Sequence, residues 1–117
     1  MLKIQLYHNP RCSKSRQTLA LLQEKDAEIE IFEYLKTPPT PEMLNTVLEK
    51  LGKEPIELIR SKESIFKELG FSLNDQRSRE EWIRILCETP KLIERPIAIT
   101  ENRALIGRPP EQVLDLF

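Results

Sequence analysis

The chain has 117 residues, of which 32% are charged and 39% hydrophobic, and its formal net charge is −1. This length and composition are typical of one globular domain, and a charge so close to zero with no basic half argues against generic binding to nucleic acids or membrane surfaces. No apolar run approaches the ~20 residues of a membrane span, and no signal-peptide core is recognised near the start. We therefore expect a cytoplasmic protein whose thiols stay reduced.

The first part of the chain has the pattern of a strand, a helix and a second strand. Apolar side chains alternate in LKIQLY at residues 2–7, and Pro10 in the following HNPRC cannot continue a strand ladder. Helical spacing runs from Ser13 to about Lys25, and EIEIFEY at residues 28–34 alternates again. Strand, helix and strand within about thirty residues predict a right-handed βαβ unit with parallel strands.

A block of helices is predicted over about residues 40–90. Its first helix begins after Thr40, a good N-cap followed by a proline, and ends at Gly52. Two short helices are expected in PIELIR and SIFKELG, and a longer one begins at the capping-box sequence SREE, where Ser78 is the cap. We expect this block to be a helical insert within one domain that spans residues 1–117.

The last part of the chain returns to strands. PIAIT and RALIG predict an antiparallel hairpin, and Pro109-Pro110 opens a final helix. The order β-α-β, helical insert, β-β-α predicts an α/β protein with a mixed sheet of four strands. This is the order of the thioredoxin-like fold, in which a proline enters the third strand. Pro96 occupies that place, and a cis Arg95–Pro96 bond is compatible with it because cis X-Pro bonds cost only about 0.5–1 kcal/mol.

Cys12 is the strongest functional candidate because it lies where the first strand turns into the first helix. Free backbone N–H groups and the positive end of the helix dipole meet at such a position, and both favour a thiolate over a thiol. The same N–H groups can hold a tetrahedral oxyanion. Arg11, Arg16 and His8 are expected to add positive charge to this turn.

Two related kinds of cysteine site do not fit the sequence. A dithiol redox centre needs a second cysteine at position 15, where the chain has Ser15, so any redox cycle requires an external thiol. A phosphatase loop of the C-x5-R kind needs an arginine at position 18, where the chain has Thr18. If an oxyanion binds beside Cys12, arginines from distant parts of the sequence must supply the charge.

The other candidates also have a plain structural interpretation. A lone cysteine in a small protein is often a passive apolar residue, and Cys87, within a predicted helix, is interpreted in that way. The two cysteines form no C-x-x-C pair, so neither a disulfide nor a metal site is expected. A single His8 is more often structural than catalytic. Arg77, in the polar stretch NDQRSR, is interpreted as a surface charge.

Four segments of the chain together resemble the glutaredoxin-linked arsenate reductase (ArsC) family. They are YHNPRCSKSRQTL, LIRSKE, TPKLIERPIAIT and IGRPPEQVLDL. They follow one another in the family's order and cover essentially the whole chain, and the resemblance is greatest to the short ArsC-like proteins of the Yfg type. It implies a thioredoxin-like fold and an oxidoreductase that converts arsenate to arsenite.

The resemblance also implies roles for five residues. The cysteine of the family's HNPxC motif is the catalytic nucleophile and matches Cys12, and the histidine of that motif tunes the pKa of the nucleophile and matches His8. Three arginines of the family bind the oxyanion, and they match Arg60 in LIR, Arg95 in ERP and Arg108 in GRP. Arginine suits this role because its planar fork of donors stays charged. No metal ligand is implied.

The partners implied by the resemblance are arsenate or a similar oxyanion, reduced glutathione as co-substrate, and glutaredoxin. No bound cofactor, nucleic acid or membrane is implied. Two other functions fit the sequence. One is a glutathione-dependent thiol reductase that acts on another substrate. The other is a regulator of the Spx type, which shares the fold and binds RNA polymerase, although such regulators typically carry a C-x-x-C motif that this chain lacks.

Overall fold

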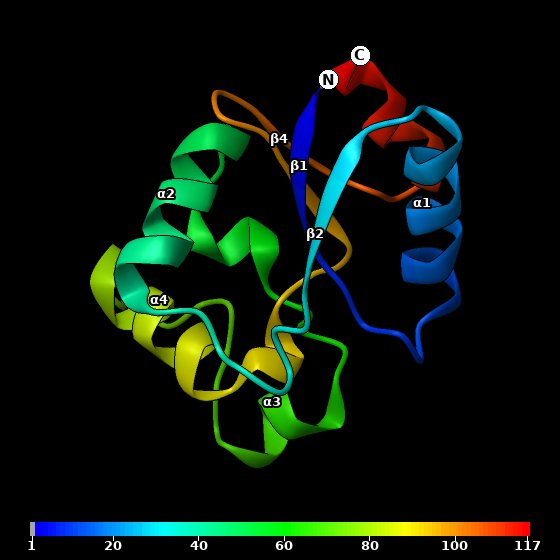
Figure 1. The fold of residues 1–117 in the computed structure, drawn as a ribbon. Helices are drawn as coiled ribbons and strands as arrows, with labels where there is room; N and C mark the ends of the chain where they lie inside the picture. Colours follow the sequence, from blue (N-terminus) through cyan, green and yellow to red (C-terminus); the bar gives the residue numbers. More distant parts are fainter. Residues whose placement is uncertain (1) are drawn as a thin grey trace. The chain divides into compact units, whose positions relative to one another are not determined.

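The chain folds into two compact units. In the computed structural model, which describes residues 2–117, the first unit comprises the chain up to Thr37 together with Arg95–Phe117, and the second is Pro38–Glu94 (Figure 1). The first unit holds the four-stranded sheet, and the second is made of helices and the loops between them. The second unit therefore covers the segment in which a helical insert is predicted.

The first unit is built on a mixed sheet. Its elements are β1 (Lys3–Tyr7), α1 (Ser13–Glu24), β2 (Glu28–Phe32), β3 (Ile97–Ile99) and β4 (Ala104–Ile106). The strand order is β2-β1-β3-β4, with β1 parallel to β2 and antiparallel to β3, and with β3 antiparallel to β4. Because α1 connects the two parallel strands, the predicted βαβ unit is confirmed. The antiparallel pairing of β3 with β4 confirms the predicted hairpin, and the mixed sheet with its helices confirms the α/β class.

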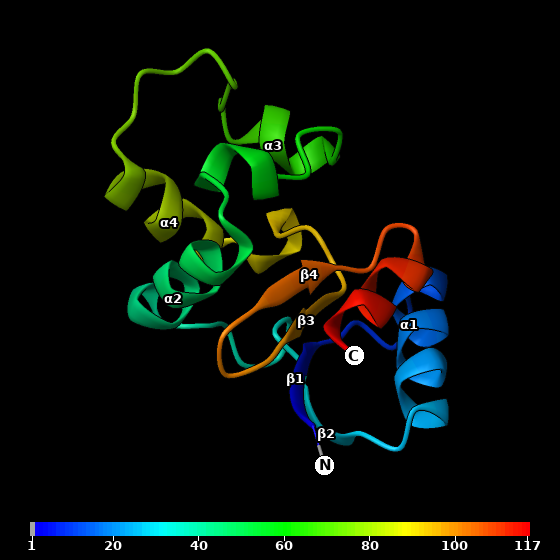
Figure 2. The ribbon, with the colours of Figure 1, turned by 90° about the horizontal axis from the view of Figure 1, so that it is seen from above.

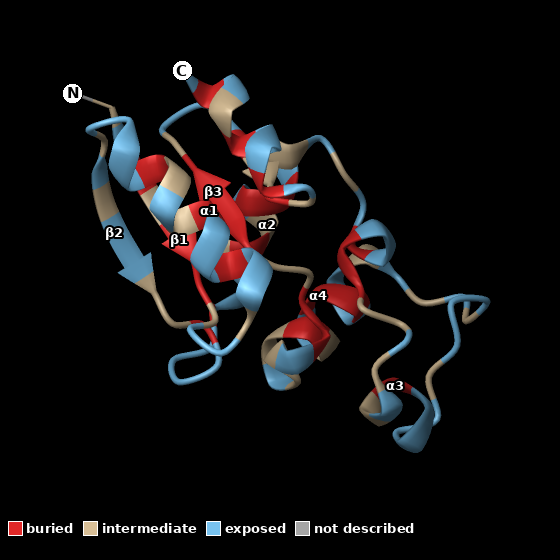
Figure 3. Ribbon diagram, turned by 90° about the vertical axis from the view of Figure 1, so that its right-hand side faces the viewer, coloured by how far each residue is buried: buried red, intermediate tan, exposed pale blue. Residues whose placement is uncertain are grey.

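One face of this sheet packs against α1 and a 3-10 helix at Pro110–Leu116. Ile4 and Leu6 of β1, Leu22 of α1 and Ala98 of β3 are all at most 1% exposed and belong to this core. The helix α1 and the C-terminal 3-10 helix lie side by side (Figure 2). The central strands β1 and β3 are mostly buried, whereas the edge strand β2 is mostly exposed (Figure 3). The predicted final helix is thus present as a 3-10 helix.

The second unit is helical, as predicted. Its signals at helix ends are confirmed: Thr40 Oγ1 accepts a hydrogen bond from the Met43 N–H, Gly52 ends the first helix with a φ of 67°, and Ser78 Oγ accepts from the Glu81 N–H. No helix in the described part of the chain is long and apolar enough to cross a membrane. The helices are α2 (Pro41–Leu51), α3 (Ser64–Glu68) and α4 (Arg79–Glu88), with 3-10 helices at Pro55–Leu58 and Pro90–Leu92.

Arg77 is not the plain surface charge that its polar neighbours in the sequence suggest. Its guanidinium carbon lies 5.1 Å from the centre of the Phe71 ring and 5.6 Å from that of Trp82, and its Nε donates to Asp75 Oδ2 at 3.2 Å. Phe71 and Trp82 also meet edge-on. The loop between α3 and α4 is therefore held against α4 by a cation–π cluster, which forms only once the chain has folded.

We expect Arg77→Ala to lower the free energy of unfolding by about 1–2 kcal/mol, because the variant loses both ring contacts and an ion pair. Arg84, an exposed arginine of α4, is the matched control. Its replacement by alanine should change stability by about 0.5 kcal/mol or less. Urea unfolding of the two variants measures the difference, and equal midpoints would show that the cluster contributes nothing.

Candidate active site

Cys12 lies at the N-terminus of α1, as the sequence predicts. It is the N-cap residue, with an extended backbone (φ −93°, ψ 124°), and its carbonyl accepts a hydrogen bond from the Arg16 N–H at 3.0 Å. Its own N–H donates to the Asn9 carbonyl at 3.0 Å, which closes the turn after β1. The first turn of α1 carries no acidic residue. The positive end of the helix is therefore open to an anion beside the half-buried Cys12 side chain.

Arg108 brings a positive charge to this thiol. Its Nη2 lies 3.7 Å from Cys12 Sγ, although 96 positions separate the two residues in the sequence. The Arg108 Nε donates a hydrogen bond to the Arg95 carbonyl at 2.8 Å, which holds the guanidinium in place. A fork of N–H donors beside a sulfur nucleophile is suited to bind the oxygens of an oxyanion.

Arg95 belongs to the same unit and stands immediately before Pro96, which enters β3. The Arg95–Pro96 bond is cis, with which the sequence is compatible, and the bond between Arg108 and Pro109 is also cis. The Nε and Nη1 atoms of Arg95 are buried, and its carbonyl accepts from Arg108. The backbone of Arg95 thus holds the side chain of Arg108, which is the other predicted oxyanion ligand of this unit. The role of the Arg95 side chain stays a prediction.

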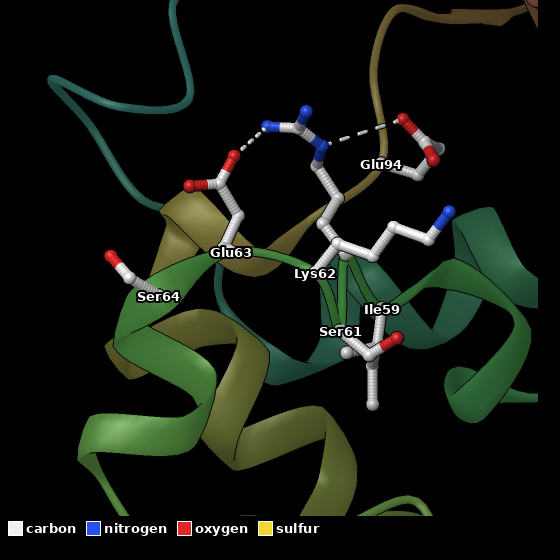
Figure 4. A pocket seen from close by; sticks show the side chains of 7 residues that line it. Ile59, Ser61, Lys62, Glu63, Ser64 and Glu94 are labelled. Atoms are coloured by element: carbon white, nitrogen blue, oxygen red, sulfur yellow. Dashed lines mark hydrogen bonds and ion pairs between the residues drawn. The ribbon is translucent and has the colours of Figure 1, made fainter.

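Arg60 lies in the second unit, where two carboxylates hold its guanidinium. The Arg60 Nη1 is paired with Glu63, and its Nε lies 3.7 Å from Glu94 Oε1 (Figure 4). The predicted contact of Arg60 with an oxyanion stays a prediction. These side chains belong to a pocket of about 450 Å³, which is lined by Ile59, Arg60, Ser61, Lys62, Glu63, Ser64 and Glu94.

His8 is buried and hydrogen-bonded to Ser15. It is only 5% exposed, its Nδ1 lies 2.7 Å from Ser15 Oγ, and that hydroxyl also accepts the Asn9 N–H at 3.0 Å. Burial lowers the pKa of His8 below its ordinary value of 6.5, with smaller contributions from Glu33, which raises it, and Arg16, which lowers it. The lowered pKa favours the neutral form of His8 at pH 7, so it does not support a positive charge from His8 in this turn.

Ser15 is a residue of this turn whose importance the sequence does not reveal. In the sequence it marks only the absence of a second cysteine. In the structure its fully buried hydroxyl joins the His8 ring to the backbone of Asn9 from within the first turn of α1. No local pattern signals this pairing, because the strand and the helix must be placed before the two side chains meet.

Almost the whole chain matches a known protein family. The model described as "ArsC family" matches residues 7–116. The chain belongs to the ArsC family. Protein YfgD of Escherichia coli (strain K12), described as uncharacterized, is 46% identical over 115 residues, which cover 97% of this chain and 96% of the relative. A protein of Neisseria meningitidis (serogroup B, strain MC58) named arsenate reductase is 39% identical over 114 residues, which cover 97% of both chains.

The fold of this ArsC chain is shared with a solved structure. The arsenate reductase from Vibrio cholerae is 43% identical, with a TM-score of 0.92, and the match covers 99% of this chain and 98% of that one. This likeness confirms the predicted thioredoxin-like fold. Of the residues that the ArsC resemblance singles out, Cys12, His8, Arg95 and Arg108 lie in the first unit and Arg60 lies in the second.

His8 should make the stability of this ArsC protein depend on pH. It is the only histidine of the chain, and its pKa is lower in the folded protein than the 6.5 of an exposed histidine. As the pH falls, the histidine of the unfolded chain binds a proton before His8 of the folded protein does. The contribution of His8 to the free energy of unfolding is therefore complete above about pH 6.5 and is lost as the pH falls below that value. The free energy of unfolding should therefore decrease between about pH 7.5 and pH 5.5, and His8→Gln should flatten the decrease. Equal slopes for the two proteins would contradict a buried, neutral His8.

The two cysteines of this ArsC protein should differ strongly in reactivity. Burial raises the pKa of Cys87 to about 11, with further contributions from Glu42 and Glu88, so this thiol stays protonated at neutral pH. Cys12, in contrast, lies at the open end of a helix beside Arg108. We expect iodoacetamide at neutral pH to modify Cys12 and to leave Cys87 intact until the pH approaches about 11. Mass spectrometry of the two cysteine peptides measures this, and equal rates at neutral pH would contradict it.

Proposed function

We propose that this chain reduces arsenate to arsenite, with Cys12 as the nucleophile and with glutathione and glutaredoxin as the source of electrons. The observation that carries the proposal is the 3.7 Å contact between Cys12 Sγ and Arg108 Nη2 at the N-terminus of α1. It puts a nucleophile and a donor for an oxyanion side by side. The naming of relatives as arsenate reductases, at 39% identity over nearly the whole chain, supports the choice of substrate.

The oxyanion is held by groups that remain charged or polarised throughout the reaction. Arg108 is the first proposed ligand of an arsenate oxygen, which its 3.7 Å distance from Cys12 Sγ supports, and the N–H groups at the start of α1 offer a second set of donors. Arg95 and Arg60 are the other proposed ligands, on the strength of the family motif. Donors that are already in place when charge develops are commonly the largest contribution to catalysis.

The reaction starts when the Cys12 thiolate attacks arsenic. An As–S bond forms, an As–O bond breaks, and the oxygen leaves as water after protonation. Glutathione then displaces a second oxygen as water and forms a second As–S bond. A glutaredoxin thiolate attacks the sulfur of that glutathione, so the electron pair of the bond stays on arsenic, which becomes As(III), and a mixed disulfide forms. Water finally displaces Cys12 and releases arsenite.

This sequence of steps agrees with the turn around Cys12. The position at which a second, resolving cysteine would stand is Ser15, whose hydroxyl is buried and bonded to His8 and Asn9. The protein therefore has no neighbouring thiol to close a disulfide with Cys12, and external thiols are needed for the two electrons. Glutathione and glutaredoxin supply them in the proposed cycle.

A coupled assay tests the proposal. Arsenate-dependent oxidation of NADPH is followed in the presence of glutaredoxin, glutathione and glutathione reductase. The wild-type protein should turn over, Cys12→Ser should be reduced to the background rate, and Cys87→Ser should behave as the wild type because Cys87 has no part in the chemistry. If the wild type shows no turnover with any of several glutaredoxins, the proposal is wrong, and a thiol reductase of another substrate or a polymerase-binding regulator becomes the better interpretation.

A further inference from the structure

Gly107 directly follows β4 and has no room for a side chain. A Cβ atom at this position would lie 2.6 Å from Thr18 Oγ1 and 2.8 Å from Pro96 Cγ, both far inside van der Waals contact. Thr18 is fully buried on α1, and its hydroxyl donates to the Lys14 carbonyl at 2.9 Å, so the side chain cannot turn away without losing that bond. The backbone at residue 107 therefore rests directly on the helix that Cys12 caps.

Two hydrogen bonds tie the same loop to the backbone before β3. The Gly107 N–H donates to the Pro96 carbonyl at 2.9 Å, and Arg108 Nε donates to the Arg95 carbonyl at 2.8 Å. The Arg108 guanidinium is thus placed from two sides, by the backbone before β3 and by the contact of the preceding residue with α1. In this position its Nη2 lies 3.7 Å from Cys12 Sγ.

We propose that Gly107 and Thr18 form a positioning pair that sets the Arg108 guanidinium against the Cys12 thiol. In a C-x5-R loop the arginine would stand at position 18 itself. In this chain position 18 carries a small buried side chain, and the packing of Gly107 on it brings in an arginine from a distant part of the sequence. The pair serves the proposed function, because the anion that Arg108 attracts would be arsenate, but the positioning can be tested without turnover.

The test compares the rates at which iodoacetate and iodoacetamide alkylate Cys12. Iodoacetate is negatively charged and iodoacetamide is neutral, so a nearby guanidinium favours the first reagent, while the fraction of thiolate cancels from the ratio of the two rates. Arg108→Gln gives the ratio in the absence of the guanidinium. We expect Gly107→Ala to lower the ratio by about fivefold, close to the value of Arg108→Gln, because a Cβ at residue 107 pushes the loop away from α1.

A second substitution, at Thr18, should relieve the steric clash that Gly107→Ala creates. Thr18→Ala removes both Thr18 atoms that a Cβ at residue 107 would meet, at 2.6 Å and 3.2 Å. The double variant Thr18→Ala/Gly107→Ala should therefore recover part of the ratio that Gly107→Ala loses, as expected for two residues in direct contact. Gly52→Ala is the matched control. It strains a left-handed glycine of the second unit, so it should reduce stability and keep the wild-type ratio.

Each outcome either supports or overturns the proposal that Gly107 and Thr18 position Arg108. A wild-type ratio in folded Gly107→Ala, or a double variant no better than the single one, would overturn the positioning pair. If Gly107→Ala does not fold, the double variant carries the test: recovery of fold and ratio supports the pair, and failure to recover them overturns it. Failure of the proposed function would look different, with no arsenate-dependent oxidation of NADPH by the wild type while the ratio still responds to Gly107→Ala.

Discussion

Replacing Arg108 with alanine should lower kcat/KM for arsenate by about 10- to 100-fold, the effect of losing a charge-assisted hydrogen bond of roughly 1.5–3 kcal/mol. The Arg108 Nη2 lies 3.7 Å from Cys12 Sγ, so an oxyanion that reaches the sulfur also reaches this donor. The variant also loses the Nε bond to the Arg95 carbonyl, which should cost about 1 kcal/mol of stability. The coupled assay and urea unfolding of the same protein separate the two effects.

Arg84→Ala is the control for this experiment, since Arg84 is exposed on α4 and takes no part in the proposed site. Arg108→Lys keeps the charge but loses the planar fork, so it should recover only part of the activity that alanine removes. Equal kcat/KM values for Arg108→Ala and Arg84→Ala would contradict the oxyanion role of Arg108. Arg95→Ala in the same assay tests the role that the family motif implies for Arg95.

Removing the Ser15 hydroxyl should destabilise the protein by about 1–3 kcal/mol, because Ser15→Ala leaves two polar groups without their partner. These are the His8 Nδ1, at 2.7 Å, and the Asn9 N–H, at 3.0 Å from the hydroxyl oxygen. Ser15 is 0% exposed and His8 is 5% exposed, so bulk water does not reach these groups to replace the lost hydroxyl as a hydrogen-bond partner. The free energy of unfolding, measured in urea at neutral pH, gives the size of the effect.

Ser13→Ala is the matched substitution for this comparison. Ser13 opens the same helix only two residues earlier, and it is exposed. Its replacement should change the free energy of unfolding by about 0.5 kcal/mol or less. If Ser15→Ala were as stable as Ser13→Ala, the hydrogen bonds around the Cys12 turn would contribute little to the fold.

Most of the secondary structure could be predicted from local patterns. Alternating apolar residues marked the strands near residues 2–7 and 28–34, and Thr40, Gly52 and Ser78 marked the ends of helices. Strand periodicity and helix capping depend on neighbours only a few residues away, which is why a single sequence is enough to find them. Local patterns failed to predict the role of Arg77, because the rings of Phe71 and Trp82 that its guanidinium contacts come together only in the folded unit.

The sequence by itself determined that Cys12 stands between a strand and a helix and that Ser15 takes the place of a second cysteine. It also determined that an oxyanion bound beside Cys12 would need arginines from distant parts of the sequence. Those conclusions rest on residues close together in the chain. Only the tertiary structure showed that Arg108 Nη2 lies 3.7 Å from Cys12 Sγ, and that His8 is buried beside Ser15 with its pKa lowered. The physical reason is that contacts across 96 positions, and the burial that lowers a pKa, exist only after the sheet has formed and α1 has packed against it.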